Sequence, residues 1–259
     1  MKPVNYVLSL SLVIFSASSL HAQDYKIAVQ NTKEGKLTLN DFPNDFPVEG
    51  YSGNEIIVTS DLPGKAPERA KGLQPVYAGG TDNTGIAVSV EKNGNQVTLQ
   101  CLLPITKSAN YKIKVPDNFS IEVDNECGHS GDVKVQNIKG EVAIENCQSI
   151  EVKNVTGPLV LSTISGNINI AFTTFPTDRP ISLASVSGEI DVTVPPKLGL
   201  DVELETVSGA IYSDFDFPAD DKKMKRIGGN SIKSRLNGGG ASMKITNVSG
   251  NIYFRKGQQ

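Results

Sequence analysis

The sequence predicts an all-β fold, a β-solenoid in which short strands stack like a single-stranded β-helix, with an N-terminal β cap region. A motif of the form [NST]-[VI]-[ST]-G-x-[IV]-x-[VI] recurs in the second half of the chain. After each motif glycine, apolar and polar residues alternate, and most apolar positions hold β-branched Ile or Val, which favours strands with one buried face. One such unit is too short to bury its apolar face, but stacked copies bury it together. A β-sandwich with accidental repeats is the alternative.

The first expected element is a leader over residues 1–22. It contains Lys2, an apolar stretch from Val7 to Phe15, and the small-residue site Leu20-His21-Ala22. This order is typical of a cleaved secretory signal peptide, and the apolar stretch is short for a membrane span. We therefore expect export to the periplasm, the outer surface or the medium, with no transmembrane segment after cleavage.

Residues 23–120 lack the motif but still contain alternating β-type segments. The pair Asn93-Gly94 suits a type I′ turn and predicts a hairpin. Because an exposed end of a strand stack invites unwanted pairing, we expect this region to start the stack and to cap it. A separate N-terminal domain is the alternative.

Residues 121–259 are expected to form the repeats, with a long charged and Gly-rich loop inserted at 214–240. The steps between motif positions are 9, 9, 8, 9, 22, 21 and 41 residues, so the later steps are interpreted as multiples of one unit with inserted loops. Asn137, Asn154 and Asn247 are expected to form a side-chain ladder at one corner. The motif positions are Gly131, Gly140, Ser149, Gly157, Gly166, Gly188, Gly209 and Gly250.

Composition excludes several classes of function. The chain has 25 Lys+Arg against 28 Asp+Glu, a net charge of −3, so it lacks the basic surplus of a nucleic-acid binder. With only two His, Ser-His-Asp triads, Cys-His dyads and multi-His zinc sites are disfavoured. We expect no cofactor and no metal site.

Two groups of acidic residues invite a functional interpretation. The first lacks the glycine and the closing glutamate of an EF-hand loop, so a solvated acidic loop is expected. Members of the second alternate with apolar residues, so they are expected on the outward face of strands and not as a pair of glycosidase carboxylates. We therefore expect no enzyme activity. The first group is Asp214, Asp216, Asp220 and Asp221; the second is Glu189, Asp191, Asp201, Glu203 and Glu205.

Three cysteines remain to be placed. Cys127 and Cys147 are 20 residues apart, close to one turn of the stack. Neighbouring strands lie about 4.8 Å apart, within reach of a disulfide, and export would permit the bond. A pair of buried thiols is the alternative. Cys101 is expected in the core.

Aromatic side chains near the insert are the other candidate site. Tyr212, Phe215 and Phe217 are close together in sequence and are a candidate aromatic surface for a glycan. Packing of the insert against the stack is the interpretation that the sequence favours for them.

The runs LDVELETVSGAIYSDFDF and LNGGGASMKITNVSGNIYFRK, together with the serial S-G-x-I units, resemble an adhesin-like β-solenoid family of exported Gram-negative bacterial proteins, a domain of unknown function. The resemblance covers roughly residues 110–256. It implies a right-handed β-solenoid in a cell-envelope or extracellular setting. It implies no catalytic residue.

Together these observations predict a non-enzymatic, exported envelope or surface protein that presents a rigid β-stack for adhesion or assembly. Its partner would be a protein or a glycan at the cell envelope. A periplasmic scaffold or regulatory binding module is the first alternative. A carbohydrate-active β-helix enzyme is the second, although the sequence shows none of the clustered charges that such enzymes use.

Overall fold

The computed structural model describes residues 22–62, 67–128, 130–175, 179–217 and 229–257. Over these ranges the chain forms 22 strands and one short 3-10 helix, Glu68–Ala70. The predicted all-β class is confirmed. The expected leader falls on residues outside the description, except for Ala22, and so does the 218–228 part of the expected insert. None of the helices in the described ranges has the length and apolarity needed to cross a membrane.

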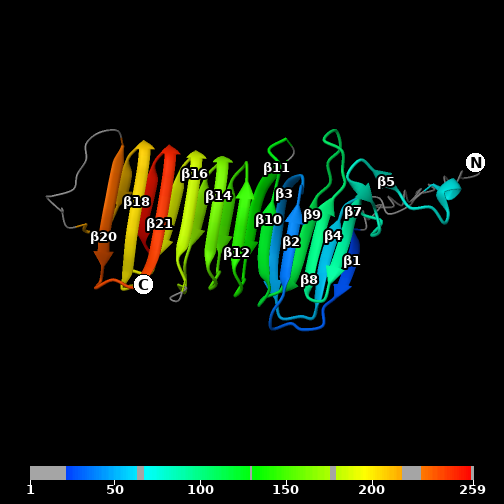
Figure 1. Ribbon diagram of the computed structural model, residues 1–259, viewed down its shortest axis with the longest axis horizontal. Coiled ribbons are helices and arrows are strands. Elements are labelled where there is room, and N and C mark those ends of the chain that lie inside the picture. The colour runs from blue at the N-terminus through cyan, green and yellow to red at the C-terminus, as the bar shows by residue number, and fades with distance from the viewer. Residues whose placement is uncertain (1–21, 63–66, 129, 176–178, 218–228, 258–259) are drawn as a thin grey trace, which may run out of the picture.

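The strands form two ten-stranded sheets and one small pair (Figure 1). Sheet A has the order β1 (Gln23–Ala28), β4 (Glu55–Ser60), β9 (Tyr111–Pro116), β3 (Asn44–Tyr51), β11 (Ser130–Gln136), β13 (Ile150–Lys153), β15 (Ile168–Ala171), β17 (Ile190–Val194), β22 (Ile252–Lys256), β19 (Ile211–Ser213). Sheet B has the order β20 (Asn230–Leu236), β18 (Leu200–Ser208), β21 (Ala241–Ser249), β16 (Ile181–Ser187), β14 (Leu159–Ser165), β12 (Val142–Asn146), β10 (Ser120–Asp124), β2 (Lys36–Asn40), β8 (Gln96–Cys101), β7 (Val88–Asn93). The small pair is β5 (Val76–Tyr77) and β6 (Gly80–Thr81).

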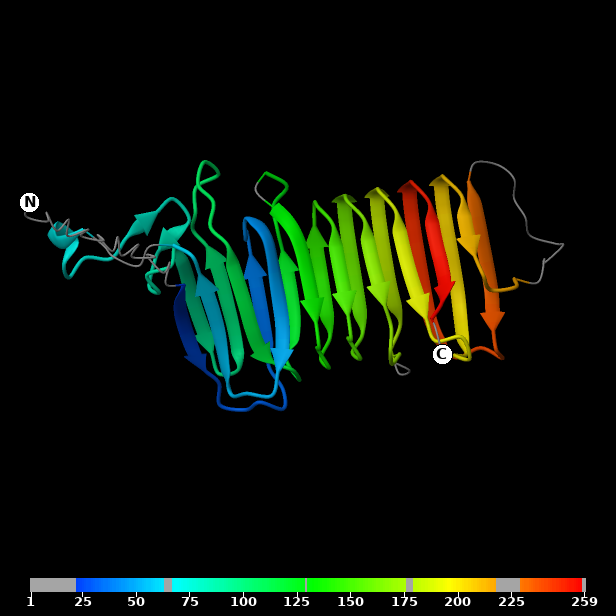
Figure 2. The same ribbon diagram turned by 180° about the vertical axis from the view of Figure 1, so that it is seen from behind.

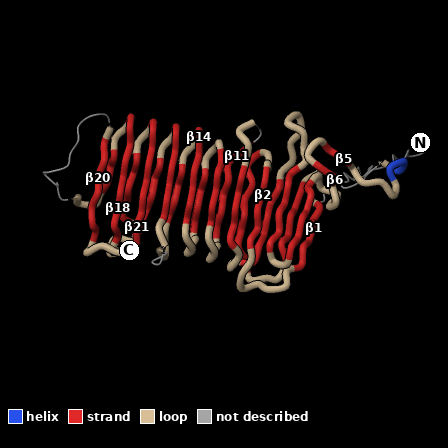
Figure 3. Tube along the Cα trace, in the orientation of Figure 1, coloured by secondary structure: helices blue, strands red, loops and turns tan. Residues whose placement is uncertain are grey.

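From β12 to β17 each strand crosses to the other sheet and pairs in parallel with the strand two before it, which produces the regular stack in Figure 3. Val142 pairs with Leu159 and Val160 pairs with Ser182, and the other turns fall between these two, so a turn takes 17 to 22 residues. The sheets are mixed, because β1–β4, β4–β9, β7–β8 and β18–β20 are antiparallel. The hairpin predicted at Asn93-Gly94 is the β7–β8 pair. The right-handed sense of the coil and the capping role of residues 23–120 stay predictions.

The order of strands in space departs from the order in sequence at both ends. Strands β21 and β22, in red in Figures 1 and 2, lie between β16–β17 and β18–β19. Likewise β2 and β3 lie between β8–β9 and β10–β11. The motif steps carried no information about this order: the turn that contains Gly250 is inserted between those of Gly188 and Gly209.

The core lies between the two sheets and follows the alternation in the sequence. On β17, Ile190 and Val192 are fully buried while Asp191 between them faces outward. Ile168 and Ile252 stand beside Ile190 on the neighbouring strands and are also fully buried. Each turn thus adds apolar side chains to one continuous column, as the repeat physics requires.

The motif glycine is required because backbones from successive turns meet at the corner. A Cβ on Gly188 would overlap the carbonyl oxygen of Gly166, and a Cβ on Gly250 would overlap that of Gly188. Both glycines also have positive φ, 140° and 135°, which other residues rarely adopt. Glycine is therefore required at these positions for two reasons: the turns pack closely, and the backbone has a positive φ.

At the corners that follow strands of sheet B, the first motif position holds a buried polar side chain, and these side chains form a ladder. The Thr163 hydroxyl donates to the Gln148 carbonyl at 2.7 Å, and the Asn247 amide donates to the Gly188 carbonyl at 2.8 Å. These side chains satisfy corner carbonyls that would otherwise be buried without a partner. Asn146 and Thr206 donate to corner carbonyls in the same way. The ladder also includes Asn125, which donates to Asn146, and Ser185, whose buried hydroxyl has no hydrogen-bond partner among the described residues.

The expected ladder of Asn137, Asn154 and Asn247 is wrong in one member. Asn137 and Asn154 do meet, with a side-chain hydrogen bond of 3.2 Å, at the corner before β12 and β14. Both have positive φ, 60° and 53°, which Asn tolerates better than most residues. Asn247 belongs to the other corner, because its motif follows a strand of sheet B and not one of sheet A.

The structure joins Cys127 and Cys147 in a disulfide, with their Cα atoms 5.1 Å apart. The bond links the chain just after β10 to the chain just after β12, which are neighbours in sheet B. Cys101 is buried with a free thiol, as expected, and burial raises its thiol pKa.

Candidate functional site

The outer face of sheet A presents two rows of side chains near the C-terminal end of the stack. Strand pairing places them in register, because each row takes the same outward position from successive strands. The first row is Glu151, Asn169, Asp191, Tyr253 and Tyr212. The second row is Lys153, Ala171, Thr193 and Arg255.

A shallow open depression of about 240 Å³ lies between and across these rows. Its floor is low because Ala171 and Thr193 are short, whereas Lys153 and Arg255 rise at its two ends. Since the floor side chains are held on paired strands, the shape of the depression is set by the stack. We call it the sheet A groove.

Two tyrosines continue the first row beyond the groove. The rings of Tyr212 and Tyr253 stack with centroids 5.3 Å apart and an interplanar angle of 13°. The guanidinium of Arg255 lies 5.2 Å from the Tyr253 ring centroid, a cation–π contact. Tyr253 is thereby covered, while Tyr212 is 53% exposed on the edge strand of sheet A.

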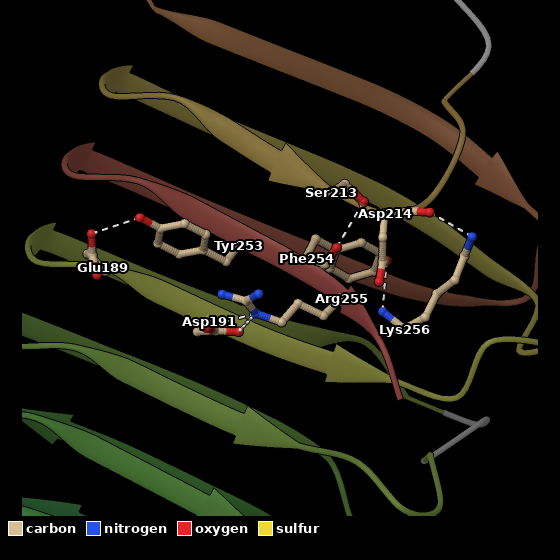
Figure 4. A network of polar contacts seen from close by, with 8 residues as sticks. All are labelled: Glu189, Asp191, Ser213, Asp214, Tyr253, Phe254, Arg255 and Lys256. Carbon is tan, nitrogen blue, oxygen red and sulfur yellow. Dashed lines mark hydrogen bonds and ion pairs between the residues drawn. The ribbon is translucent and has the colours of Figure 1, made fainter. Parts of the chain in front are cut away.

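Polar contacts hold Tyr253 and Arg255 in place (Figure 4). The Tyr253 hydroxyl donates to Glu189 Oε1 at 3.1 Å. Arg255 Nε donates to both carboxylate oxygens of Asp191, at 2.8 and 3.0 Å. The same carboxylate raises the pKa of Arg255. The aromatic end of the groove is therefore a fixed arrangement of side chains.

Two of the candidate site residues, Phe215 and Phe217, do not lie on the outer face of sheet A, because contacts with β22 hold the turn that carries them. Lys256 binds the turn after β19, since its Nζ donates to the Asp214 carbonyl at 2.6 Å and its backbone N–H donates to the Asp214 carboxylate at 2.8 Å. That turn directs Phe215 onto Phe254, a core residue, with centroids 5.2 Å apart, and Phe217 lies 6.3 Å from the same ring.

The structure thus separates the three aromatic residues that the sequence grouped. Tyr212 is on the outer face, but Phe215 is buried and Phe217 is partly buried at the end of the core. The candidate surface of Tyr212, Phe215 and Phe217 is not formed, because the strand and the following turn direct these side chains to opposite faces. The favoured interpretation, packing against the stack, is confirmed for Phe215 and Phe217. Tyr212 is joined instead by Tyr253.

Sequence reasoning missed Tyr253 as the neighbour of Tyr212. It also missed Asn169, Ala171 and Arg255 as residues of the sheet A groove. One signal was available: Tyr212 and Tyr253 are each the third residue after a motif glycine, in SGAIY and SGNIY. Equal motif positions stack in equal registers. The other residues needed the pairing of strands, which the motif alone does not specify.

The acidic residues of the strands face outward, as expected, and most have a basic partner. Arg235 Nε lies 3.1 Å from Asp201, and Lys233 Nζ lies 2.9 Å from Glu203. The hydrogen bond from Lys233 lowers the pKa of Glu203. In the described ranges, no three His, Cys, Asp or Glu side chains gather in a way that could hold a metal ion. Asp220 and Asp221 lie outside those ranges.

A known family has the same repeats: the model of Toastrack DUF4097 matches residues 125–255, half of the chain. The chain belongs to the Toastrack DUF4097 family. The match begins at the polar ladder, with Asn125, and ends at Arg255 in the sheet A groove. Both the groove and the tyrosine pair therefore lie within the Toastrack region.

Two solved structures are similar to the chain at 12% identity. One is described as "a putative cell adhesion protein" from Clostridium sporogenes, with a TM-score of 0.44, and covers 92% of this chain and 100% of its own. The other is described as "a putative adhesin" from Bacteroides fragilis, with a TM-score of 0.38, and covers 91% and 97%. No curated protein matches the sequence. The expected restriction of the family to Gram-negative bacteria stays a prediction.

Proposed function

We propose that this Toastrack protein is an exported, non-enzymatic envelope or surface protein that binds a partner on the outer face of sheet A. In this proposal residues 1–22 are a cleaved leader, the strands coil as a right-handed solenoid, and residues 23–120 cap the stack. The single observation that carries the proposal is the sheet A groove with the exposed Tyr212 ring at its end.

Rigidity supports a role in binding. The groove residues sit on strands that pair on both sides, and the aromatic end is fixed by the Arg255–Asp191 and Tyr253–Glu189 contacts. Side chains held in their bound geometry lose little entropy when a partner arrives. A rigid β-stack is thus suited to presenting a preformed surface.

The pairing of charges supports a non-enzymatic role. A catalytic acid or base commonly has a strongly perturbed pKa inside a cleft. Here Asp191 is engaged by Arg255 on an open face, and Glu203 by Lys233 and Lys244 on the opposite sheet. Their arrangement is that of solvated ion pairs on strands.

Protease accessibility on intact producing cells tests the location, with a known periplasmic protein as the control. The proposal predicts that the chain is cut while the control survives. If the chain is protected until the outer membrane is opened, surface display is wrong and the protein is a periplasmic binding module. If it is not exported at all, the proposed function fails.

A further inference from the structure

We propose that the sheet A groove binds a neutral oligosaccharide that lies across the strands, with one sugar ring stacked on Tyr212. This inference rests on the proposed function and gives the chemical class of its ligand. It follows from the charge balance of the groove, its open shape, and the exposed but already stacked ring of Tyr212 at its aromatic end.

The charge balance selects an uncharged ligand. The four charged side chains that line the groove are two acids and two bases, and they pair locally as Lys153 with Glu151 and Arg255 with Asp191. An anionic or cationic polymer would have to break these pairs to gain a partner of its own. Hydroxyl groups can instead share the carboxylate and guanidinium groups without breaking the pairs.

The shape selects an extended ligand. At about 240 Å³ the depression is smaller than the roughly 300–1,000 Å³ of typical small-molecule pockets, and it is open along its length. The first row runs over five strands from β13 to β19, about 19 Å at a strand spacing of about 4.8 Å. A chain of linked rings lying across the strands would contact the whole row.

The aromatic end supplies a stacking surface. Tyr212 is half exposed, yet its ring is already ordered by stacking on Tyr253. The face of an aromatic ring carries negative charge, so it attracts the weakly positive C–H groups of a sugar ring. Because the ring is positioned in advance, stacking costs little entropy.

Other occupants fit less well. A nucleic acid needs a surplus of basic side chains to neutralise its phosphates, and the groove has none. A folded protein or a peptide binds through apolar anchors in pockets. The large apolar residues that line this groove, Val152 and Ile170, are buried, so it presents no exposed apolar side chain to such a partner beyond Ala171. The ion pairs and the Asn169 amide are suited to hydroxyl groups.

The test uses the chain purified from the cells that produce it. Binding is measured by titration against soluble neutral tetrasaccharides of glucose, galactose, mannose and N-acetylglucosamine, with oligogalacturonate and sulfated dextran as anionic probes. We expect at least one neutral series to bind, and both anionic probes to bind more weakly.

Variants locate the site. Tyr212→Ala should weaken binding about tenfold, which corresponds to about 1.4 kcal/mol, while Tyr212→Phe keeps the ring and should bind as the wild type does. Ala171→Leu fills the groove and should also weaken binding. Ala184→Leu is the matched control, since Ala184 faces outward on β16 of the opposite sheet. Far-ultraviolet circular dichroism checks that each variant folds.

Three results would overturn the inference: tighter binding of the anionic probes, neutral binding that survives both Tyr212→Ala and Ala171→Leu, or no binding of any neutral probe. If any of these occurs while the protein is cut by protease on intact cells, the proposed function stands and only the ligand class is wrong. If the protein is protected on intact cells, surface display fails independently of the sugar titration.

Discussion

At the residue scale, each position of the repeat motif has a packing role at one corner of the stack. Its first position supplies a buried donor such as Thr163, which satisfies a corner carbonyl. Its glycine allows backbone to contact backbone between turns, as Gly188 does with Gly166. The alternating residues that follow send Ile190 inward and Asp191 outward. The same few residues therefore determine the core and the outer rows of the sheet A groove.

The corner glycines predict a large and local stability effect. Gly188→Ala should lower the free energy of unfolding by at least about 2 kcal/mol, because the new Cβ meets the Gly166 carbonyl at a φ of 140°. Denaturant unfolding measures it. Gly128→Ala is the control, since a Cβ there meets nothing within 4 Å and its backbone needs no positive φ. Equal stability of the two variants would contradict the packing account.

At the element scale, ion pairs join strands that are distant in sequence. Lys36 on β2 and Glu122 on β10 are neighbours in sheet B, with Lys36 Nζ 2.6 Å from Glu122 Oε2. Thr38 Oγ1 donates to the same oxygen at 3.1 Å. The pair ties the inserted strand β2 to the first strand of the predicted repeat region.

This pair predicts a weak dependence of stability on pH. The hydrogen bond from Lys36 lowers the pKa of Glu122 in the folded chain. The stabilisation is therefore complete above the ordinary glutamate pKa of about 4.3 and is lost as the pH falls below it through the lowered value. Both side chains are about half exposed, so the effect stays under about 1 kcal/mol.

The comparison of Glu122→Gln with the wild type measures the contribution of the Lys36–Glu122 pair to the pH dependence of stability. Between about pH 5 and pH 3, the denaturation midpoint of the variant should fall less steeply with acid than that of the wild type. This pH range follows from the ordinary glutamate pKa of about 4.3. Glu34→Gln, at an exposed position, is the control. Identical acid profiles of Glu122→Gln and the wild type would show that the pair contributes nothing.

At the scale of the whole molecule, the stack is interleaved at both ends. β21 and β22 fill the layer between β16–β17 and β18–β19, so the end of the chain completes turns that were formed earlier in the sequence. β18 pairs with β21 along almost its whole length, and β19 pairs only with β22 among the described strands. The tyrosine pair exists because of this order.

Removal of the inserted layer should therefore affect its neighbours more than the distant turns. In a chain that ends at Gly240, amide hydrogens of β19 should lose protection from exchange, as its opening free energy falls towards zero once β22 is gone. Those of β12 to β15 should keep it, because each turn contacts only adjacent turns. Strand β18 keeps its antiparallel partner β20 and is not the reporter. A chain that ends at Lys256 retains β21 and β22 and is the control. Protection of β19 that survives the truncation would contradict the interleaved order.

Sequence reasoning predicted the periodic part of this molecule and not its order. Ile168, Ile190 and Val192 were placed correctly, because period-two alternation is a local property of the chain. The insertion of β21 between β16 and β18 was missed, since identical motifs carry no information about which copy lies beside which. For the same reason Tyr212 was grouped with Phe215 and Phe217, its neighbours in sequence, and not with Tyr253, its neighbour in space.

The most direct test of the central claim, that the outer face of sheet A binds the partner, is an NMR titration of the chain with labelled tyrosine rings. The chain has seven tyrosines, of which two form the pair at the groove. On addition of a neutral tetrasaccharide that binds, the account predicts shifts of the Tyr212 and Tyr253 ring signals and unchanged signals from Tyr111, which is buried at the other end of the stack. Binding that leaves the Tyr212 and Tyr253 signals unmoved would contradict it.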